Sequence, residues 1–108
     1  MVELIWTEAA VSDLNAIADY IALDDPKAAR LLVQRVIRHV EQLRAHPESG
    51  SVPRELRGMC YRQIVERPCR VFYRFDAGTV FVLHVIRGEM LLRRSKLVKR
   101  DRKRLSGE

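Results

Sequence analysis

The apolar positions of residues 1–45 predict one short strand followed by two helices. A run of β-type residues covers 2–6 and ends at Trp6. Over residues 8–23, apolar side chains recur at intervals of three and four, which is the period of a helix with one buried face. A second stripe of the same period predicts a helix over 26–45. Because the junction between the helices is so short, we expect an antiparallel helical hairpin.

The second half of the chain predicts an antiparallel meander of three strands. Strand-like runs cover residues 59–66, 69–75 and 79–86, and residues typical of turns separate them. The last run is apolar on both faces, which is typical of a central strand. The element order β-α-α-β-β-β predicts an α+β fold in two layers, with the N-terminal strand and the helical hairpin packed on an antiparallel sheet.

One face of this predicted sheet has no helix to cover it. Alternation along residues 69–75 places Val71, Tyr73 and Phe75 on one face and Arg70, Phe72 and Arg74 on the other. We expect the second set to lie on the open face. A basic surface that also carries an aromatic side chain can bind a phosphate backbone or an acidic peptide.

The positive charge of the chain is confined to its C-terminal end. The 108 residues carry a formal charge of +6. Residues 1–86 hold eleven Lys or Arg and eleven Asp or Glu, whereas residues 87–108 hold nine basic and three acidic residues. Such a block attracts polyanions, which include nucleic acid, an acidic membrane leaflet and acidic protein segments. A second interpretation is that this tail docks on the sheet through Leu91, Leu92, Leu97 and Val98 and completes the core.

The sequence lacks the motifs of the common enzyme classes. It contains no Gly-rich nucleotide loop, no HExxH, no GxSxG and no paired CxxC motifs. We therefore expect no catalytic residue, no metal site and no cofactor. The apolar runs are too short for a membrane span or a signal peptide, so we expect a cytoplasmic protein without a membrane partner.

Several stretches, in their order and spacing, form a pattern that extends over about residues 2–88. The main ones are Ile5-Trp6-Thr7-Glu8-Ala9-Ala10, Asp25-Pro26-Lys27-Ala28-Ala29, His46-Pro47-Glu48-Ser49-Gly50, Cys69-Arg70-Val71-Phe72-Tyr73-Arg74-Phe75 and Val82-Leu83-His84-Val85-Ile86-Arg87-Gly88. This pattern resembles the ParE toxins of the ParE/RelE superfamily, which are the toxin halves of bacterial type II toxin–antitoxin modules. The resemblance implies a ParE-like toxin domain over residues 1–88. We expect residues 89–108 to form a basic tail within the same single domain.

The resemblance implies two alternative activities for such a toxin. ParE-type members are associated with poisoning of DNA gyrase, and RelE-type members cleave mRNA on the ribosome. RelE-like enzymes place lysines on the first meander strand, an arginine on the second, and an arginine and a tyrosine beyond the last. Only Arg70 matches that set, and an arginine cannot transfer protons at any relevant pH. We therefore expect an inhibitor that acts by binding and is not an enzyme.

The nuclease interpretation stays open as an alternative, because Tyr61, Glu55 and His84 could supply unconventional acid–base groups. A third alternative is a nucleic-acid-binding module without toxicity. It predicts steeply salt-dependent binding by the isolated chain.

Two surfaces follow from the preferred interpretation. The contacts with gyrase, or with its DNA, are expected to come from Arg87, Arg93, Arg94, Lys96, Lys99 and Arg100. The contacts with a cognate ParD-like antitoxin are expected to come from Arg62, Arg70, Phe72 and Arg74. The antitoxin segment should be acidic and amphipathic, and the two proteins should form a toxin–antitoxin hetero-oligomer.

Overall fold

The structure is a computed structural model that describes residues 1–88, 90 and 92–105. Its elements in chain order are β1 (Glu3–Trp6), α1 (Glu8–Ala22), α2 (Pro26–Glu41), β2 (Arg62–Glu66), β3 (Cys69–Asp76), β4 (Thr79–Arg87) and α3 (Arg94–Leu105). Both helices of the hairpin begin where the sequence predicts. The first meander strand begins at Arg62, later than expected, because a loop with a 3₁₀ turn at Arg54–Leu56 precedes it.

Side-chain caps fix where the two hairpin helices begin. The Thr7 hydroxyl accepts a hydrogen bond from the Ala10 amide at 3.3 Å and donates one to the Val82 carbonyl at 2.8 Å. The Asp25 carboxylate accepts from the Ala28 amide at 3.0 Å, and Pro26 occupies the first turn of α2. These caps satisfy amide groups that a helix start leaves without a partner.

The four strands form one sheet in the order β1-β4-β3-β2. The meander β2-β3-β4 is antiparallel, as predicted, and β4 is a central strand. β1 pairs with β4 in parallel, so the sheet is mixed, and the connection between these two strands runs through α1, α2, β2 and β3. No helix within the described ranges is long and apolar enough to cross a membrane.

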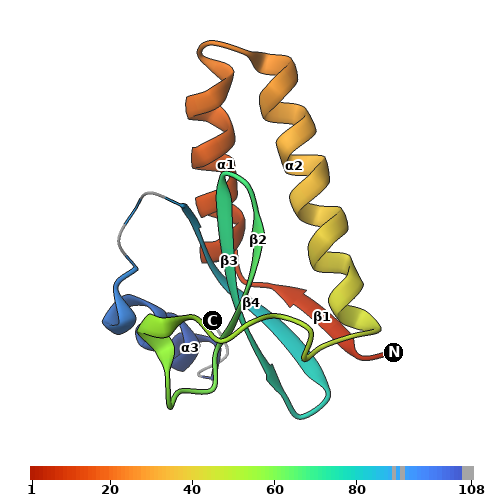
Figure 1. The fold of residues 1–108 in the computed structure, drawn as a ribbon, viewed down its shortest axis with the longest axis vertical. Helices are drawn as coiled ribbons and strands as arrows, with labels where there is room; N and C mark the ends of the chain where they lie inside the picture. Colours follow the sequence, from red (N-terminus) through yellow and green to blue (C-terminus); the bar gives the residue numbers. More distant parts are fainter. Residues whose placement is uncertain (89, 91, 106–108) are drawn as a thin grey trace.

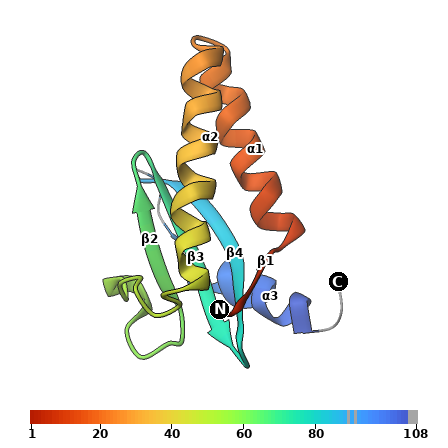
Figure 2. The same cartoon turned by 90° about the vertical axis from the view of Figure 1, so that its right-hand side faces the viewer.

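The sheet is covered on both faces, and each face has its own buried cluster. The predicted alternation of β3 is confirmed: Val71 and Tyr73 pack with the α1–α2 hairpin, whereas Phe72 packs on the opposite face. In Figures 1 and 2 the hairpin α1–α2 extends toward one end of the molecule, and α3 lies at the other. The basic tail therefore forms a helix that adds a third layer to the two-layer arrangement.

The expectation of an open sheet face displaying Phe72 is wrong, because α3 and Leu92 cover that face. Phe72 is 0% exposed, and the buried residues around it include Leu92 and Leu97, with Val98 packed against the cluster. The alternative of a tail that completes the core is confirmed for these three residues. Leu91, which belonged to the same prediction, lies outside the described residues.

Candidate functional site

The carboxylate of Asp101 connects α3 to the meander. Asp101 is 3% exposed, and its Oδ2 accepts hydrogen bonds from Tyr61 Oη at 2.8 Å and from Arg74 Nη1 at 2.7 Å. Its Oδ1 accepts from Arg104 Nε at 2.6 Å. Burial alone would raise the pKa of Asp101, but the hydrogen bonds from these three side chains outweigh it and lower the pKa. Asp101 therefore stays ionised and holds α3 in place.

The carboxylate of Asp13 connects α1, β4 and α3 in the same way. Asp13 Oδ2 lies 2.8 Å from His84 Nδ1 and accepts from the Val85 amide at 3.0 Å. The Arg100 guanidinium contacts both carboxylate oxygens, with Nη2 3.0 Å from Oδ1. Burial would raise the pKa of Asp13, but the bonds from His84, Arg100 and Val85 hold it well below its usual range.

The contacts of the Asp13 carboxylate with His84 and Arg100 predict that its contribution to the free energy of unfolding is lost in acid. Above the ordinary carboxyl pKa of about 4, Asp13 is ionised in both the folded and the unfolded chain, and its stabilising contribution is complete. Below that pH the unfolded chain binds the proton first, so the contribution is lost as the pH falls toward the lowered pKa of the folded state. Asp13→Asn cannot titrate. The difference in unfolding free energy between wild type and Asp13→Asn is expected to shrink by up to about 1.4 kcal/mol per pH unit below about pH 4.

Urea unfolding at several pH values between 5 and 3 measures this difference. Asp19→Asn, at an exposed position of the same helix, is the control and should show no such change. A difference between wild type and Asp13→Asn that stays constant down to pH 3 would contradict the assignment.

The four residues expected to contact an antitoxin have different surroundings. Phe72 is buried, so it cannot serve as a surface contact. Arg70 donates to both carboxylate oxygens of Glu55 at 3.1 Å and lies over the Phe72 ring. Arg74 is bound by Asp101. Arg62 keeps a partly exposed side chain, which donates to the Gly50 carbonyl at 2.9 Å.

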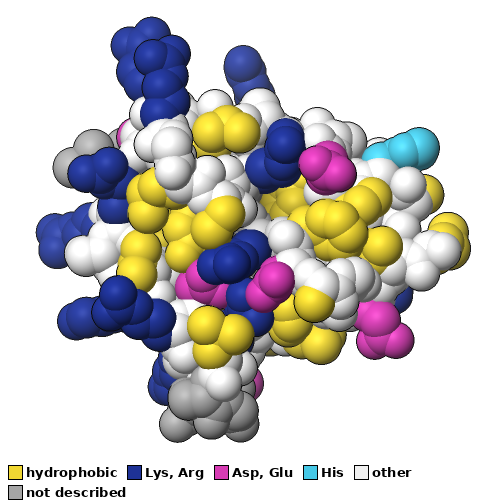
Figure 3. Space-filling view, turned by 90° about the horizontal axis from the view of Figure 1, so that it is seen from below, with side chains coloured by type: hydrophobic (Ala, Val, Ile, Leu, Met, Phe, Trp, Pro, Cys, Tyr) yellow, Lys and Arg dark blue, Asp and Glu magenta, His cyan; other side chains and the backbone are white. Residues whose placement is uncertain are grey.

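The six residues expected to contact the target also separate into two groups. Arg100 is part of the Asp13 cluster, and Arg87 stacks over the Tyr20 ring at 5.1 Å. The other four are exposed at the start of α3 or along it: Arg93, Arg94, Lys96 and Lys99. In Figure 3 basic side chains gather on the side of the molecule where α3 lies in Figure 1. This side is the cationic surface that the charge distribution predicts.

The side chains proposed for unconventional nuclease chemistry are engaged in structural contacts. Burial and the hydrogen bond to Asp101 raise the pKa of Tyr61 to about 12. The hydrogen bonds from Arg70 lower the pKa of Glu55. His84 is 4% exposed and is bound to Asp13. At neutral pH a protonated tyrosine and an ionised, paired glutamate do not form an acid–base pair matched to that pH.

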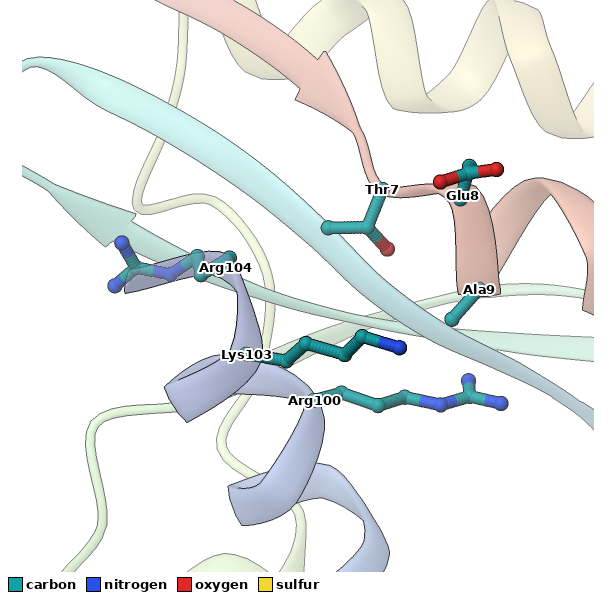
Figure 4. Close-up of a pocket in the computed structure, with 6 residues that line it drawn as sticks. All are labelled: Thr7, Glu8, Ala9, Arg100, Lys103 and Arg104. Atoms are coloured by element: carbon teal, nitrogen blue, oxygen red, sulfur yellow. The ribbon is translucent and has the colours of Figure 1, made fainter. Parts of the chain in front are cut away.

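Several cavities border the hairpin or α3, and one of about 410 Å³ lies between α1, β4 and the start of α3. A small one, of about 60 Å³, lies where Arg100 and Lys103 extend from α3 toward the first turn of α1, as Figure 4 shows. A larger apolar groove, of about 430 Å³, lies between α1 and α2 beside Trp6, and Val11, Val33 and Ile37 line it. In the described part of the chain, no three His, Cys, Asp or Glu side chains are placed to hold a metal ion together.

Sequence reasoning missed the two carboxylates that organise this region. Asp101 is the one acidic residue in the basic helix α3, and that isolation is the signal that could have identified it. Asp13 gave no comparable signal, because it is one of several acidic residues on α1 and its partners are 71 and 87 residues away.

Comparison with known proteins places the chain in a family. The sequence model described as "ParE toxin of type II toxin-antitoxin system, parDE" matches residues 4–92. The chain belongs to the ParE toxin family. This ParE-family toxin is 31% identical over 87 residues to a curated protein named Toxin RelE2 from Caulobacter vibrioides, and the match covers 81% of this chain and 92% of that one.

A solved structure agrees with the assignment. The chromosomal ParDE system from P. aeruginosa contains a chain that is 31% identical to this toxin, with a TM-score of 0.68. The match covers 82% of this toxin and 98% of that chain. Helix α3 of this toxin, Arg94–Leu105, lies beyond the residues that match the family model.

Proposed function

We propose that this ParE-family toxin inhibits DNA gyrase by binding, without catalysing a reaction of its own. The observation that carries the proposal is the exposed cationic surface of α3, which offers attachment to a large polyanionic assembly. The membership of the ParE family supports gyrase as the target class. An inhibitor that traps one state of its target needs only to bind that state more tightly than the others.

The contacts of Tyr61, Glu55 and His84 support inhibition by binding over cleavage of mRNA by the toxin. RNA cleavage needs a base for the 2′-hydroxyl and an acid for the leaving oxygen. Tyr61 donates to Asp101, Glu55 is paired with Arg70, and His84 is bound to Asp13. Each of these groups stabilises the fold in a separate contact.

Neutralisation by a ParD-like antitoxin is the second part of the proposal. The groove between α1 and α2 has a mostly apolar lining, and Val11 and Ile37 on its walls are partly exposed. It fits the apolar side chains of an amphipathic segment. Because the toxin carries a net charge of +6, an acidic segment is favoured. An antitoxin whose toxin-binding segment is strongly basic would contradict this part.

A supercoiling assay with purified gyrase and toxin tests the main proposal. Wild-type toxin is expected to block supercoiling and to accumulate linear plasmid, and it should leave mRNA intact on translating ribosomes. The triple variant K96Q/K99Q/R102Q should raise the inhibitory concentration at least about tenfold, because it removes three exposed charges from α3.

The matched control is K27Q/R30Q/R38Q, which removes the same charge from exposed positions of α2 and should inhibit like wild type. Cleavage of mRNA by the wild-type toxin, abolished by a change at Tyr61 or His84, would overturn the proposal. Full supercoiling in the presence of wild-type toxin would also overturn it.

A further inference from the structure

The exposed cations of α3 form a stripe along one side of the helix. Lys96, Lys99 and Arg102 follow one another at intervals of three, so they share a face and span about 9 Å along the axis. Arg93 and Arg94, at the start of the helix, extend the same exposed charge. We call these five residues the α3 stripe.

Within the described ranges, no acidic residue forms an ion pair with the α3 stripe. The one acid of the helix, Asp101, faces the interior, where Tyr61, Arg74 and Arg104 surround it. Among the residues the structure describes, none carries a carboxylate that pairs with a side chain of the stripe. The acidic side chain of α3 and the guanidiniums of Arg100 and Arg104 are therefore used in contacts with the rest of the fold, whereas the charges of the stripe remain exposed.

The composition of the stripe fits a phosphate backbone better than a protein surface. The cores of protein interfaces are depleted in lysine and are anchored by buried aromatic side chains and arginines. The stripe is exposed throughout and includes two lysines but no aromatic side chain, and Lys and Arg are the side chains that neutralise phosphates. The absence of an aromatic side chain from α3 also disfavours single strands, whose proteins stack bases on aromatic rings.

We propose that the α3 stripe binds the phosphate backbone of duplex DNA without reading its sequence. The inference rests on the proposed function in one respect: a toxin that also holds DNA would be anchored to the duplex that gyrase carries. Binding to DNA itself is a property of the isolated toxin and is measurable without gyrase. Five phosphate contacts would give a slope of log K against log salt of about −4 to −5, with a dissociation constant on the order of 10⁻⁴ to 10⁻⁶ M at physiological salt.

Fluorescence anisotropy with a labelled 20-base-pair duplex, titrated with the full chain at 50 to 200 mM salt, tests the proposal. K96Q/K99Q/R102Q is expected to weaken binding more than tenfold at the lowest salt and to reduce the slope by about 2 to 3. K27Q/R30Q/R38Q should stay within about threefold of wild type, because it leaves the α3 stripe intact. Both variants lose the same net charge, so any difference in affinity between them comes from where the charge lies. A duplex of different sequence should bind equally, and a 20-nucleotide single strand more weakly.

Circular dichroism is the folding control, and both triple variants are expected to keep their helices because all six positions are exposed. Equal weakening of the two variants, or a wild-type slope near zero, would overturn the inference. If DNA binding is absent while supercoiling is still inhibited, the DNA inference fails and the gyrase proposal survives. If DNA binding depends on the stripe while gyrase is unaffected, the inference stands and the gyrase proposal fails.

Discussion

Replacing Asp101 with alanine is expected to lower the free energy of unfolding by about 3–5 kcal/mol. The variant would leave the Arg74 and Arg104 guanidiniums and the Tyr61 hydroxyl without their shared acceptor. The side chains of Asp101 and Arg104 are only 5% and 7% exposed, so water cannot easily replace the acceptor of Arg104 Nε, although Arg104 Nη2 keeps its bond to Asp76. Removing one partner from a buried network of charged groups lowers the free energy of unfolding more than removing an exposed ion pair does.

Urea unfolding at neutral pH measures the loss, with Asp24→Ala as the control. Asp24 is exposed after α1, so its replacement should change stability by no more than about 0.5 kcal/mol. Asp101→Asn should fall between wild type and Asp101→Ala, because it keeps an acceptor for Tyr61 but loses the charge. An Asp101→Ala protein as stable as Asp24→Ala would show that the network does not hold α3.

Replacing Leu97 with alanine is expected to cost about 2–5 kcal/mol by leaving a cavity beneath α3. Leu97 is 0% exposed and belongs to the cluster that covers the second face of the sheet with Phe72 and Leu83. Leu105→Ala is the matched control, since it makes the same chemical change on the same helix at a position that is 65% exposed. The control should remain within about 0.5 kcal/mol of wild type.

Equal stabilities of Leu97→Ala and Leu105→Ala in urea unfolding would mean that α3 does not complete the core.

The structural contacts of α3 make its deletion a poor test of function. Removing α3 would expose Phe72 and Leu83 and leave Arg74 and Asp13 without partners from that helix. A truncated toxin would therefore confuse loss of folding with loss of binding, whereas Gln substitutions in the α3 stripe change charge alone.

The candidate site was predictable only in its charge. The excess of Lys and Arg after residue 86 correctly indicated a cationic surface, because lysines such as Lys96 and Lys99 are rarely buried unless they are paired with an acidic group. The same charge count could not separate Arg100 from these lysines. Arg100 is bound to Asp13, a residue 87 positions earlier in the chain, and no local pattern encodes such a pair.

Periodicity and capping residues by themselves determined the helical hairpin, the meander and the inward and outward sides of β3. These are properties of neighbouring residues, such as Thr7 before α1 or the alternation of Val71 and Phe72. Only the tertiary structure decided that α3 covers Phe72 and that Asp13 and Asp101 take up part of the basic charge. Burial and ion pairing depend on which distant segments meet in space, and that outcome is not contained in the period of any single segment.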